Sequence, residues 1–154
     1  MVFSEKEPDE ALLEVLIKLS KDWEAENSCR GYRANTAADI EGNRIFTAEE
    51  DGSILAYLFG YHEKSRNSSS VMPEGTDVFE VEELYVRPER RSQGIGRRLF
   101  EFAENSVRNE VDYIMLSTAT KNFRAILHFY VDELDMSFWN ARLFKKLNRE
   151  DQTL

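Results

Sequence analysis

The chain has 154 residues and has little of what marks a secreted, membrane-spanning or metal-clustered protein. Cys29 is its only cysteine, which excludes an internal disulfide framework and a thiolate metal cluster. The longest apolar run, Ile54 to Phe59, falls far short of the roughly 20 residues that a membrane-spanning helix needs. Residues 1–7 show neither the basic nor the apolar segment of a signal peptide. We therefore expect a cytoplasmic protein with no membrane partner and no metal site.

Positive charge is also scarce. The chain has 29 Asp and Glu against 20 Lys and Arg, a formal charge of −9 and a pI near 4.8. Binding of nucleic acids or anionic membranes depends on a field of Lys and Arg, so neither is expected as a partner, and cationic partners are favoured. A domain takes about 100–200 residues, so residues 1–154 are expected to form a single domain.

Helical and strand patterns alternate along the chain and predict an α/β fold around a mixed sheet. Apolar residues recur at helical spacing over 8–26, and Asp51-Gly52 is a dipeptide that tight hairpin turns prefer. The segment 64–77 is rich in Ser, Pro and Gly and is predicted to be a mobile loop. We expect helices over 8–26, 36–40, 94–109 and 122–131, and extended segments over 44–50, 53–62, 78–86, 113–117 and 136–147.

The strongest local signal lies between the strand 78–86 and the helix that follows it. Residues 87–98 carry five arginines and one glutamate, a local charge of +4, so the other residues sum to −13. The N-terminus of the helix offers free backbone N–H groups, and Gly94 and Gly96 let a ligand approach the backbone closely. This pattern predicts a diphosphate site, although a solvated basic turn would look similar. A Walker loop is absent, and a dinucleotide-binding loop would need glycine where Leu99 stands.

Two motifs resemble those of the GNAT superfamily of N-acetyltransferases. The hexapeptide from Arg91 to Gly96 has the form Arg/Gln-x-x-Gly-x-Gly/Ala of its acyl-CoA loop. Further along, the second motif is matched by Asn122, Ala125, Phe129 and Tyr130. The resemblance covers roughly residues 44–140. Two departures accompany it: Asp135-Met136 stands where the family has Gly-Phe, and the customary first strand is reduced to residues 1–3 or missing.

The resemblance implies a fold and a co-substrate. The fold would be a twisted, mostly antiparallel mixed sheet of about six strands, flanked by about four helices. A splayed strand pair would hold acetyl-CoA, with backbone groups of Leu84 and Val86 on the pantetheine arm and N–H groups of residues 92–97 on the pyrophosphate. Homodimers are common in the superfamily. The implied cofactor-binding residues are Leu84, Tyr85, Val86, Arg91, Ser92, Gln93, Gly94, Ile95, Gly96, Arg97, Asn122 and Phe129.

Acetyl transfer from a thioester to an amine requires an acid for the leaving thiolate and a base for the protonated amine. The resemblance places the Tyr130 hydroxyl near the CoA sulfur and makes it the candidate acid. Without the motif, Tyr130 reads as a core aromatic beside Phe123, Ile126 and Leu127.

The candidate bases lie in the strand 78–86. Its period of two puts Glu80, Glu82, Leu84 and Val86 on one face and Glu83 on the other, unless a bulge intervenes. Residues 82–86 are similar to the Glu-Asp-Leu-Tyr-Val of polyamine and related small-amine acetyltransferases, whose first acid acts as base through water. That favours Glu82, followed by Glu80 and then Glu83, while all three could instead face solvent.

Together these features predict an acetyl-CoA-dependent N-acetyltransferase that works by direct attack in a ternary complex. A small primary amine is the favoured acceptor, such as a polyamine, an aminoglycoside or an amino-acid derivative. Two alternatives stay open: a non-catalytic acyl-CoA-binding regulatory module, and an acetyltransferase for protein lysines or N-termini. Acceptor identity would depend on loops 27–43 and 63–77.

Overall fold

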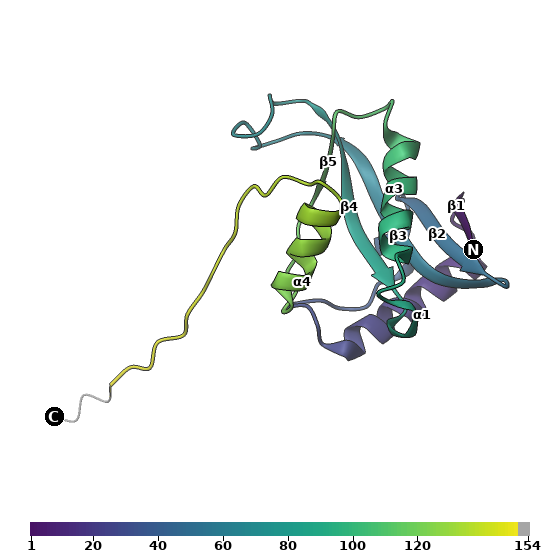
Figure 1. The fold of residues 1–154 in the computed structure, drawn as a ribbon, viewed down its shortest axis with the longest axis horizontal. Helices are drawn as coiled ribbons and strands as arrows, with labels where there is room; N and C mark the ends of the chain where they lie inside the picture. The colour runs from purple at the N-terminus through teal and green to yellow at the C-terminus, as the bar shows by residue number, and fades with distance from the viewer. Residues whose placement is uncertain (151–154) are drawn as a thin grey trace.

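The computed structural model describes residues 1–150 and shows one five-stranded sheet in the order β1-β2-β3-β4-β5 (Figure 1). Neighbouring strands pair antiparallel except β4 and β5, which are parallel. The strands are β1 Val2–Lys6, β2 Arg44–Glu50, β3 Ser53–Lys64, β4 Asp77–Val86 and β5 Tyr113–Leu116. The helices are α1 Glu10–Glu26, α2 Ala37–Ile40, α3 Ile95–Val107 and α4 Phe123–Leu127, with a 3-10 turn η1 Pro88–Arg90 and a π-helical turn η2 His128–Glu133.

This architecture confirms the predicted α/β class and the mostly antiparallel sheet, but two expectations about the strands were wrong. Where a remnant at residues 1–3 or no strand was expected, β1 pairs along its whole length with β2, from Val2 opposite Glu49 to Lys6 opposite Ile45. The segment 136–147, expected to be extended, has no strand partner among residues 1–150. The sheet therefore has five strands rather than about six.

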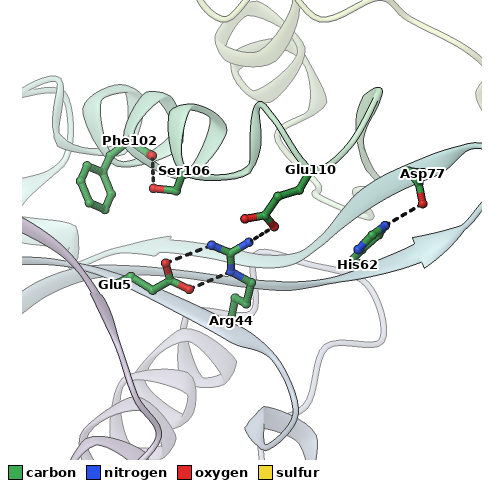
Figure 2. A network of polar contacts seen from close by, with 7 residues as sticks. All are labelled: Glu5, Arg44, His62, Asp77, Phe102, Ser106 and Glu110. Atoms are coloured by element: carbon green, nitrogen blue, oxygen red, sulfur yellow. Dashed lines mark hydrogen bonds and ion pairs between the residues drawn. The ribbon is translucent and has the colours of Figure 1, made fainter.

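A charged contact fixes β1 to the rest of the sheet (Figure 2). Arg44 at the start of β2 donates from Nε and Nη2 to the two carboxylate oxygens of Glu5, at 2.7 and 3.0 Å. Its Nη1 donates to Glu110, just beyond α3, at 2.6 Å. A two-pronged arginine–carboxylate contact is the geometry in which a surface ion pair contributes to stability. Nothing in the sequence predicts that Glu5 and Glu110 bind the same arginine.

The sheet carries an apolar core on each face. Helix α3 packs on one face and α1 on the other, and α4 lies on the side of α3 (Figure 1). The α3 side includes Phe46, Leu58, Phe79, Val81, Leu99 and Phe100. The α1 side includes Leu16, Leu19, Ile45, Tyr57, Phe59 and Tyr85. No helix among residues 1–150 is both long enough and apolar enough to cross a bilayer.

A bulge interrupts the pairing of β3 with β4. Phe59 lies opposite Glu83, but the next residue, Gly60, lies opposite Val81, so Glu82 is an extra residue on β4. Gly60 is required at this point, because a Cβ there would overlap the carbonyl oxygen of Glu80. The bulge shifts the alternation of side chains along the rest of β4.

The bulge corrects the predicted faces of β4. Glu80, Glu82, Leu84 and Val86 were expected to share one face, and they do not. Leu84 and Val86 pack with the core on the α3 side, whereas Tyr85 belongs to the core on the α1 side. Glu83 also faces the α1 side, where it bonds to a residue of that core. Glu82 is exposed at the bulge.

The parallel pairing of β4 with β5 ends at the same point. Its last matched residues are Val81 and Leu116, so on that side residues 82–86 have no partner strand in the described chain. The two strands therefore part at Glu82, as the predicted splayed pair requires. The backbone groups at the end of β4 are therefore left without a strand partner on the side of β5.

Replacing Gly60 tests the bulge. We expect Gly60→Ala to lower the free energy of unfolding by about 1–3 kcal/mol, the usual cost of forcing an extra carbon into packed structure. The matched control is Ser53→Ala, at an exposed position of the same strand. Urea unfolding measures both variants. Equal midpoints for the two would show that the close approach of Gly60 to Glu80 does not constrain the sheet.

Candidate active site

The turn after β4 places the N-terminus of α3 next to the end of β4, where β4 has lost its pairing with β5. Ser92 and Gly94 have positive φ angles of 61° and 78°, which turn the chain sharply into the helix. Helix α3 begins at Ile95, one residue later than predicted, and no side chain caps it. Its first backbone N–H groups therefore stay available to an anionic ligand, as the sequence led us to expect.

Gly96 is where the two sequence motifs meet. A Cβ on Gly96 would lie 3.3 Å from Cγ2 of Val86 and 3.6 Å from Cζ of Phe129. The end of β4, the first turn of α3 and the Phe129 ring thus converge on a residue that has no side chain. Glycine at this point keeps the backbone of α3 close to the end of β4, and a larger residue would push the three apart.

The arginines of the turn do not all face outward. Arg91 donates from Nε to the carbonyl oxygen of Val86 at 2.9 Å, and its other two nitrogens bind the Glu26 carboxylate at 2.9 and 2.8 Å. It also lies over the Tyr85 ring, 5.4 Å from the centroid. Arg91 therefore joins the turn to β4 and to the end of α1. Arg97, in the first turn of α3, is exposed and paired with Glu101 at 3.0 Å.

Tyr130 lies in η2, directly after Phe129, whose ring reaches Gly96 of α3. The centroid of its ring lies 6.2 Å from that of Phe100 of α3, in an edge-on arrangement, and 4.9 Å from that of the neighbouring Phe129. Burial, with a smaller contribution from Cys29, raises the pKa of the Tyr130 hydroxyl to about 12. This group is therefore protonated at neutral pH, as an acid must be before it donates. A π-helical turn at this place is typical of functional sites.

Asn122 stands at the N-cap position of α4, where the sequence predicted it, but its side chain makes no cap hydrogen bond. Its own N–H is held by Oγ1 of Thr120 at 3.2 Å, and its carbonyl oxygen accepts from Ile126 at 3.2 Å. Asparagine is a common N-cap residue, and its position before this helix predicts a side-chain cap. That prediction is wrong, because the Asn122 side chain does not bond to the helix. The helix after it is shorter than the predicted 122–131, because η2 takes over at His128.

Glu83 is the carboxylate that the protein surrounds most closely. Tyr57 donates to it at 2.8 Å, Tyr32 at 3.3 Å, and the Asn35 amide nitrogen contacts both of its oxygens at 3.0 and 2.9 Å. Burial raises the pKa of Glu83, and the three donors act in the opposite direction. Since Tyr32 and Asn35 belong to the segment between α1 and α2, Glu83 ties that segment to β4.

Glu80 and Glu82 have surroundings unlike those of Glu83. Burial, together with the charges of Glu63 and Glu82, raises the pKa of Glu80 to about 7. Glu82 lines an open hollow of about 340 Å³ beside α2. The other lining residues are Asp39, Glu41, Gly42, Asn43 and Tyr61. Among the three candidate bases, Glu80 has a raised pKa, Glu82 is exposed, and Glu83 is held by hydrogen bonds.

The sequence missed several residues of this region. Tyr57 reads as an ordinary core position of a strand, and nothing in the pattern links it to an acid. Tyr32, Asn35 and Glu26 lie far from β4 in sequence and meet it only through the packing of α1. The continuous apolar run of β3 does predict that Tyr57 is buried, and a buried hydroxyl needs a partner. No group of three or more side chains suited to a metal ion occurs within residues 1–150.

Comparison with solved structures shows the same fold in known acetyltransferases. An aminoglycoside 6′-N-acetyltransferase from Acinetobacter haemolyticus is 16% identical, with a TM-score of 0.65 over 97% of this chain and 100% of that one. A Trypanosoma brucei acetyltransferase is 16% identical, with a TM-score of 0.63 over 95% and 100%. An aminoglycoside N-acetyltransferase in complex with CoA is 14% identical, with a TM-score of 0.66 over 96% and 100%. No curated protein sequence matches significantly.

The family model described as the acetyltransferase (GNAT) family matches residues 11–134, which include the glycine turn, the splayed end of β4 and the turn that carries Tyr130. That family uses acetyl-CoA, and its members transfer the acetyl group to amines. The chain therefore belongs to the acetyltransferase (GNAT) family and is an N-acetyltransferase.

Proposed function

We propose that the chain acts as one catalytic domain that transfers an acetyl group from acetyl-CoA to a primary amine of a small cationic molecule, by direct attack in a ternary complex. One observation carries the proposal: the uncapped N-terminus of α3, the unpaired end of β4 and the turn that carries Tyr130 converge at Gly96. These are the three parts that acyl transfer needs, namely an anion site, an edge for the pantetheine amides and an acid.

The residues present suit acetyl-CoA. The N–H groups of the first turn of α3 and the turn 92–94 would hold the pyrophosphate, and Gly94, with no atom within 4 Å of its Cβ position, leaves the backbone open to it. Backbone groups of Leu84 would bond to the pantetheine arm, since β4 lacks a partner there. Val86 differs, because its carbonyl oxygen already accepts from Arg91. Arg97 is placed to neutralise phosphate, whereas Arg91 acts through its hold on Val86 and Glu26.

The acceptor amine must lose a proton before it attacks. An alkylamine with a pKa near 10.4 is about 99.9% protonated at pH 7. We assign the base to Glu82, which is exposed at the bulge and so can reach a substrate, directly or through water. Glu83 is a weaker candidate because three side chains already bond to it. Glu80, with a pKa of about 7, is suited to pass the proton on from Glu82.

The leaving thiolate needs a proton, and Tyr130 is assigned as its donor. The hydroxyl is protonated at rest, and the contacts of its ring with Phe100 and Phe129 fix its direction. The amine nitrogen forms a bond to the thioester carbonyl carbon, the carbon–sulfur bond breaks, and the sulfur takes the hydroxyl proton. The amine proton leaves through Glu82.

The acceptor is proposed to be a small cationic amine. The acids Glu82, Asp39 and Glu41 line the hollow beside α2, and Glu80 lies close enough to Glu82 for that charge to raise its pKa, within a chain of net charge −9. Such a field raises the local concentration of cations. The acetyltransferases of this fold that carry aminoglycoside in their names add support for the same class. Polyamines and aminoglycosides are therefore the acceptors to test first.

Replacement of Tyr130 by Phe keeps the ring contacts and removes the proton donor. We expect kcat to fall roughly 10²–10⁴-fold, the usual contribution of a positioned acid, with little change in the affinity for acetyl-CoA. Thiol release from acetyl-CoA measures the rate, and calorimetry measures the affinity. Tyr113→Phe, at an exposed tyrosine of β5, is the control. An undiminished rate in Tyr130→Phe would remove the assigned role.

A second experiment distinguishes Glu82 from Glu83 as the general base. Glu82→Gln is expected to lower kcat/KM roughly 10²–10⁴-fold, because a general base is lost. Glu74→Gln, at an exposed loop position, is the control and should behave as the wild type. If Glu83→Gln abolishes turnover and Glu82→Gln does not, the base has been assigned to the wrong carboxylate.

Titration of Glu80 has a consequence for stability. Its folded pKa of about 7 lies above the unfolded value of 4.5, so the stability it contributes is complete below pH 4.5 and is lost as pH rises through about 7. We expect Glu80→Gln to gain stability relative to the wild type across that interval. Urea unfolding between pH 4.5 and 8 measures the difference. A constant difference across this range would contradict the raised pKa.

The acceptor class is tested with a panel of amines. Diamines, polyamines and aminoglycosides should give higher kcat/KM values than neutral or anionic primary amines of similar size, and added salt should narrow the difference. Tight acetyl-CoA binding with no turnover of any amine or protein would indicate a non-catalytic module. Preferential acetylation of protein lysines or N-termini would indicate a protein acetyltransferase.

A further inference from the structure

A second groove adjoins the hollow that contains Glu82. It lies between α1 and α2, has a volume of about 490 Å³, and is called the α1–α2 groove below. Glu41, directly after α2, lines both the groove and the hollow. A ligand that reacts beside Glu82 could therefore extend past Glu41 into the groove.

Half of the groove lining is apolar. Leu13 and Ile17 of α1 face Ala37 of α2 there, with Pro8 at the end of the groove before α1. Leu13 and Ile17 lie four residues apart, so they share one face of the helix. Both are half-buried against the core on the α1 side. This part of the lining suits the methylene chain of a ligand.

The other half of the lining is acidic. Glu10 and Glu14 are also four residues apart on α1, and Asp9 and Glu41 add two further carboxyl groups. All four acids are exposed, whereas Leu13 and the other helical apolar residues are half-buried. The groove therefore has an apolar floor and a negatively charged rim.

The acids that line the groove and the hollow have no basic partner in the described chain. They are Asp9, Glu10, Glu14, Asp39, Glu41 and Glu82. No Lys, Arg or His among residues 1–150 forms an ion pair with any of them. Elsewhere Glu5, Glu26 and Glu50 each bind an arginine. A cationic ligand would supply the positive charge that the lining acids lack.

The groove suits a linear oligoamine better than a peptide. Both of its walls are helices, whose backbone groups bond mainly within the helix, so the main chain of a peptide would find few partners. Glu10 and Glu14 instead offer charges at the spacing of residues four apart on a helix, about 5–6 Å between Cβ atoms. Ammonium groups joined by short methylene chains repeat at a similar interval. The methylene groups would lie on Leu13 and Ile17.

We infer that the α1–α2 groove binds the distal part of the acceptor, and that the preferred acceptor is a linear oligoamine with three or more ammonium groups. Its terminal amine would react beside Glu82, its chain would pass Glu41, and its distal ammonium groups would contact Glu10 and Glu14. This role rests on the proposed function and adds which amines are preferred. Glu10 and Glu14 are specificity-determining residues and take no part in the chemical step.

A series of acceptors of increasing length tests the inference. Propylamine, 1,3-diaminopropane, spermidine and spermine carry one, two, three and four amines, and each has a propylamine end. We expect kcat/KM of the wild type to rise at least about tenfold from 1,3-diaminopropane to spermine, mainly through a lower KM, because the distal contacts are the same before and during the reaction. Equal values for these two acceptors would overturn the inference.

Glu10→Gln combined with Glu14→Gln removes the distal charges. We expect kcat/KM for spermine to fall roughly 3–30-fold, the usual effect of losing two exposed ion pairs, and that for propylamine to stay unchanged. Glu74→Gln combined with Asp112→Asn is the control, since it removes the same charge at exposed positions outside the groove and the hollow. An equal loss in both double variants would mean that net charge alone attracts spermine, and would overturn the inference.

Ala37→Phe fills the groove without changing its charge. We expect this variant to lose the advantage of spermine over 1,3-diaminopropane while it still acetylates propylamine at the wild-type rate. Ala38→Phe, at the exposed neighbouring position outside the groove, is the control and should keep the advantage. An advantage of spermine that survives in Ala37→Phe would contradict binding in the groove.

The short amines separate this inference from the proposed function. Turnover of propylamine and 1,3-diaminopropane without any preference for longer acceptors would overturn the inference alone. No turnover of any amine in the series would instead contradict the proposed function. A lysine peptide that gives a higher kcat/KM than spermine, and that loses it in Ala37→Phe, would assign the groove to a peptide and overturn the inference.

Discussion

The site depends on the close approach of Gly60 to the carbonyl of Glu80, which forces one extra residue into β4. The pairing of β4 with β5 stops at the neighbouring residue, Val81. After this point Leu84 and Val86 face α3, while Glu83 and Tyr85 face α1. A single irregularity thus gives the two faces of this strand end different chemistry, with apolar side chains on one and a carboxylate and a tyrosine on the other.

Strong local patterns made much of the fold predictable. The hairpin at Asp51-Gly52, the long first helix and the glycine turn before α3 each rest on nearby residues, and the structure contains all three. The faces of β4 were predicted wrongly, because a strict period of two was applied through residues 80–86. The adjacent acids Glu82 and Glu83 interrupt that period in the sequence, and the cross-strand contact of Gly60 shows that a bulge lies there. Likewise β1 is recognisable once Glu5 meets Arg44, a contact across 39 positions.

The charged residues of this protein form specific local pairs that its net charge does not reveal. Two of the five arginines after β4 pair with glutamates of other elements, Arg90 with Glu50 and Arg91 with Glu26, so their side chains hold the turn in place as well as contributing positive charge. The acids of β4 differ in the same way, since one is bound by tyrosines and an asparagine and another is exposed. The formal charge of residues 87–98 was visible in the sequence, but the partner of each arginine was not.

The π-helical turn at His128–Glu133 has a consequence for how this region tolerates change. It holds one more residue than an α-helical turn would, between the residues that contact α3 and the residues where the chain leaves the fold. Loss of any single residue there would let the turn relax to α-helix. Everything after it would then rotate by about 100°, the angle one residue subtends in an α-helix. The length of this turn is therefore constrained, because the turn sets both the direction of Tyr130 and the exit of the last residues.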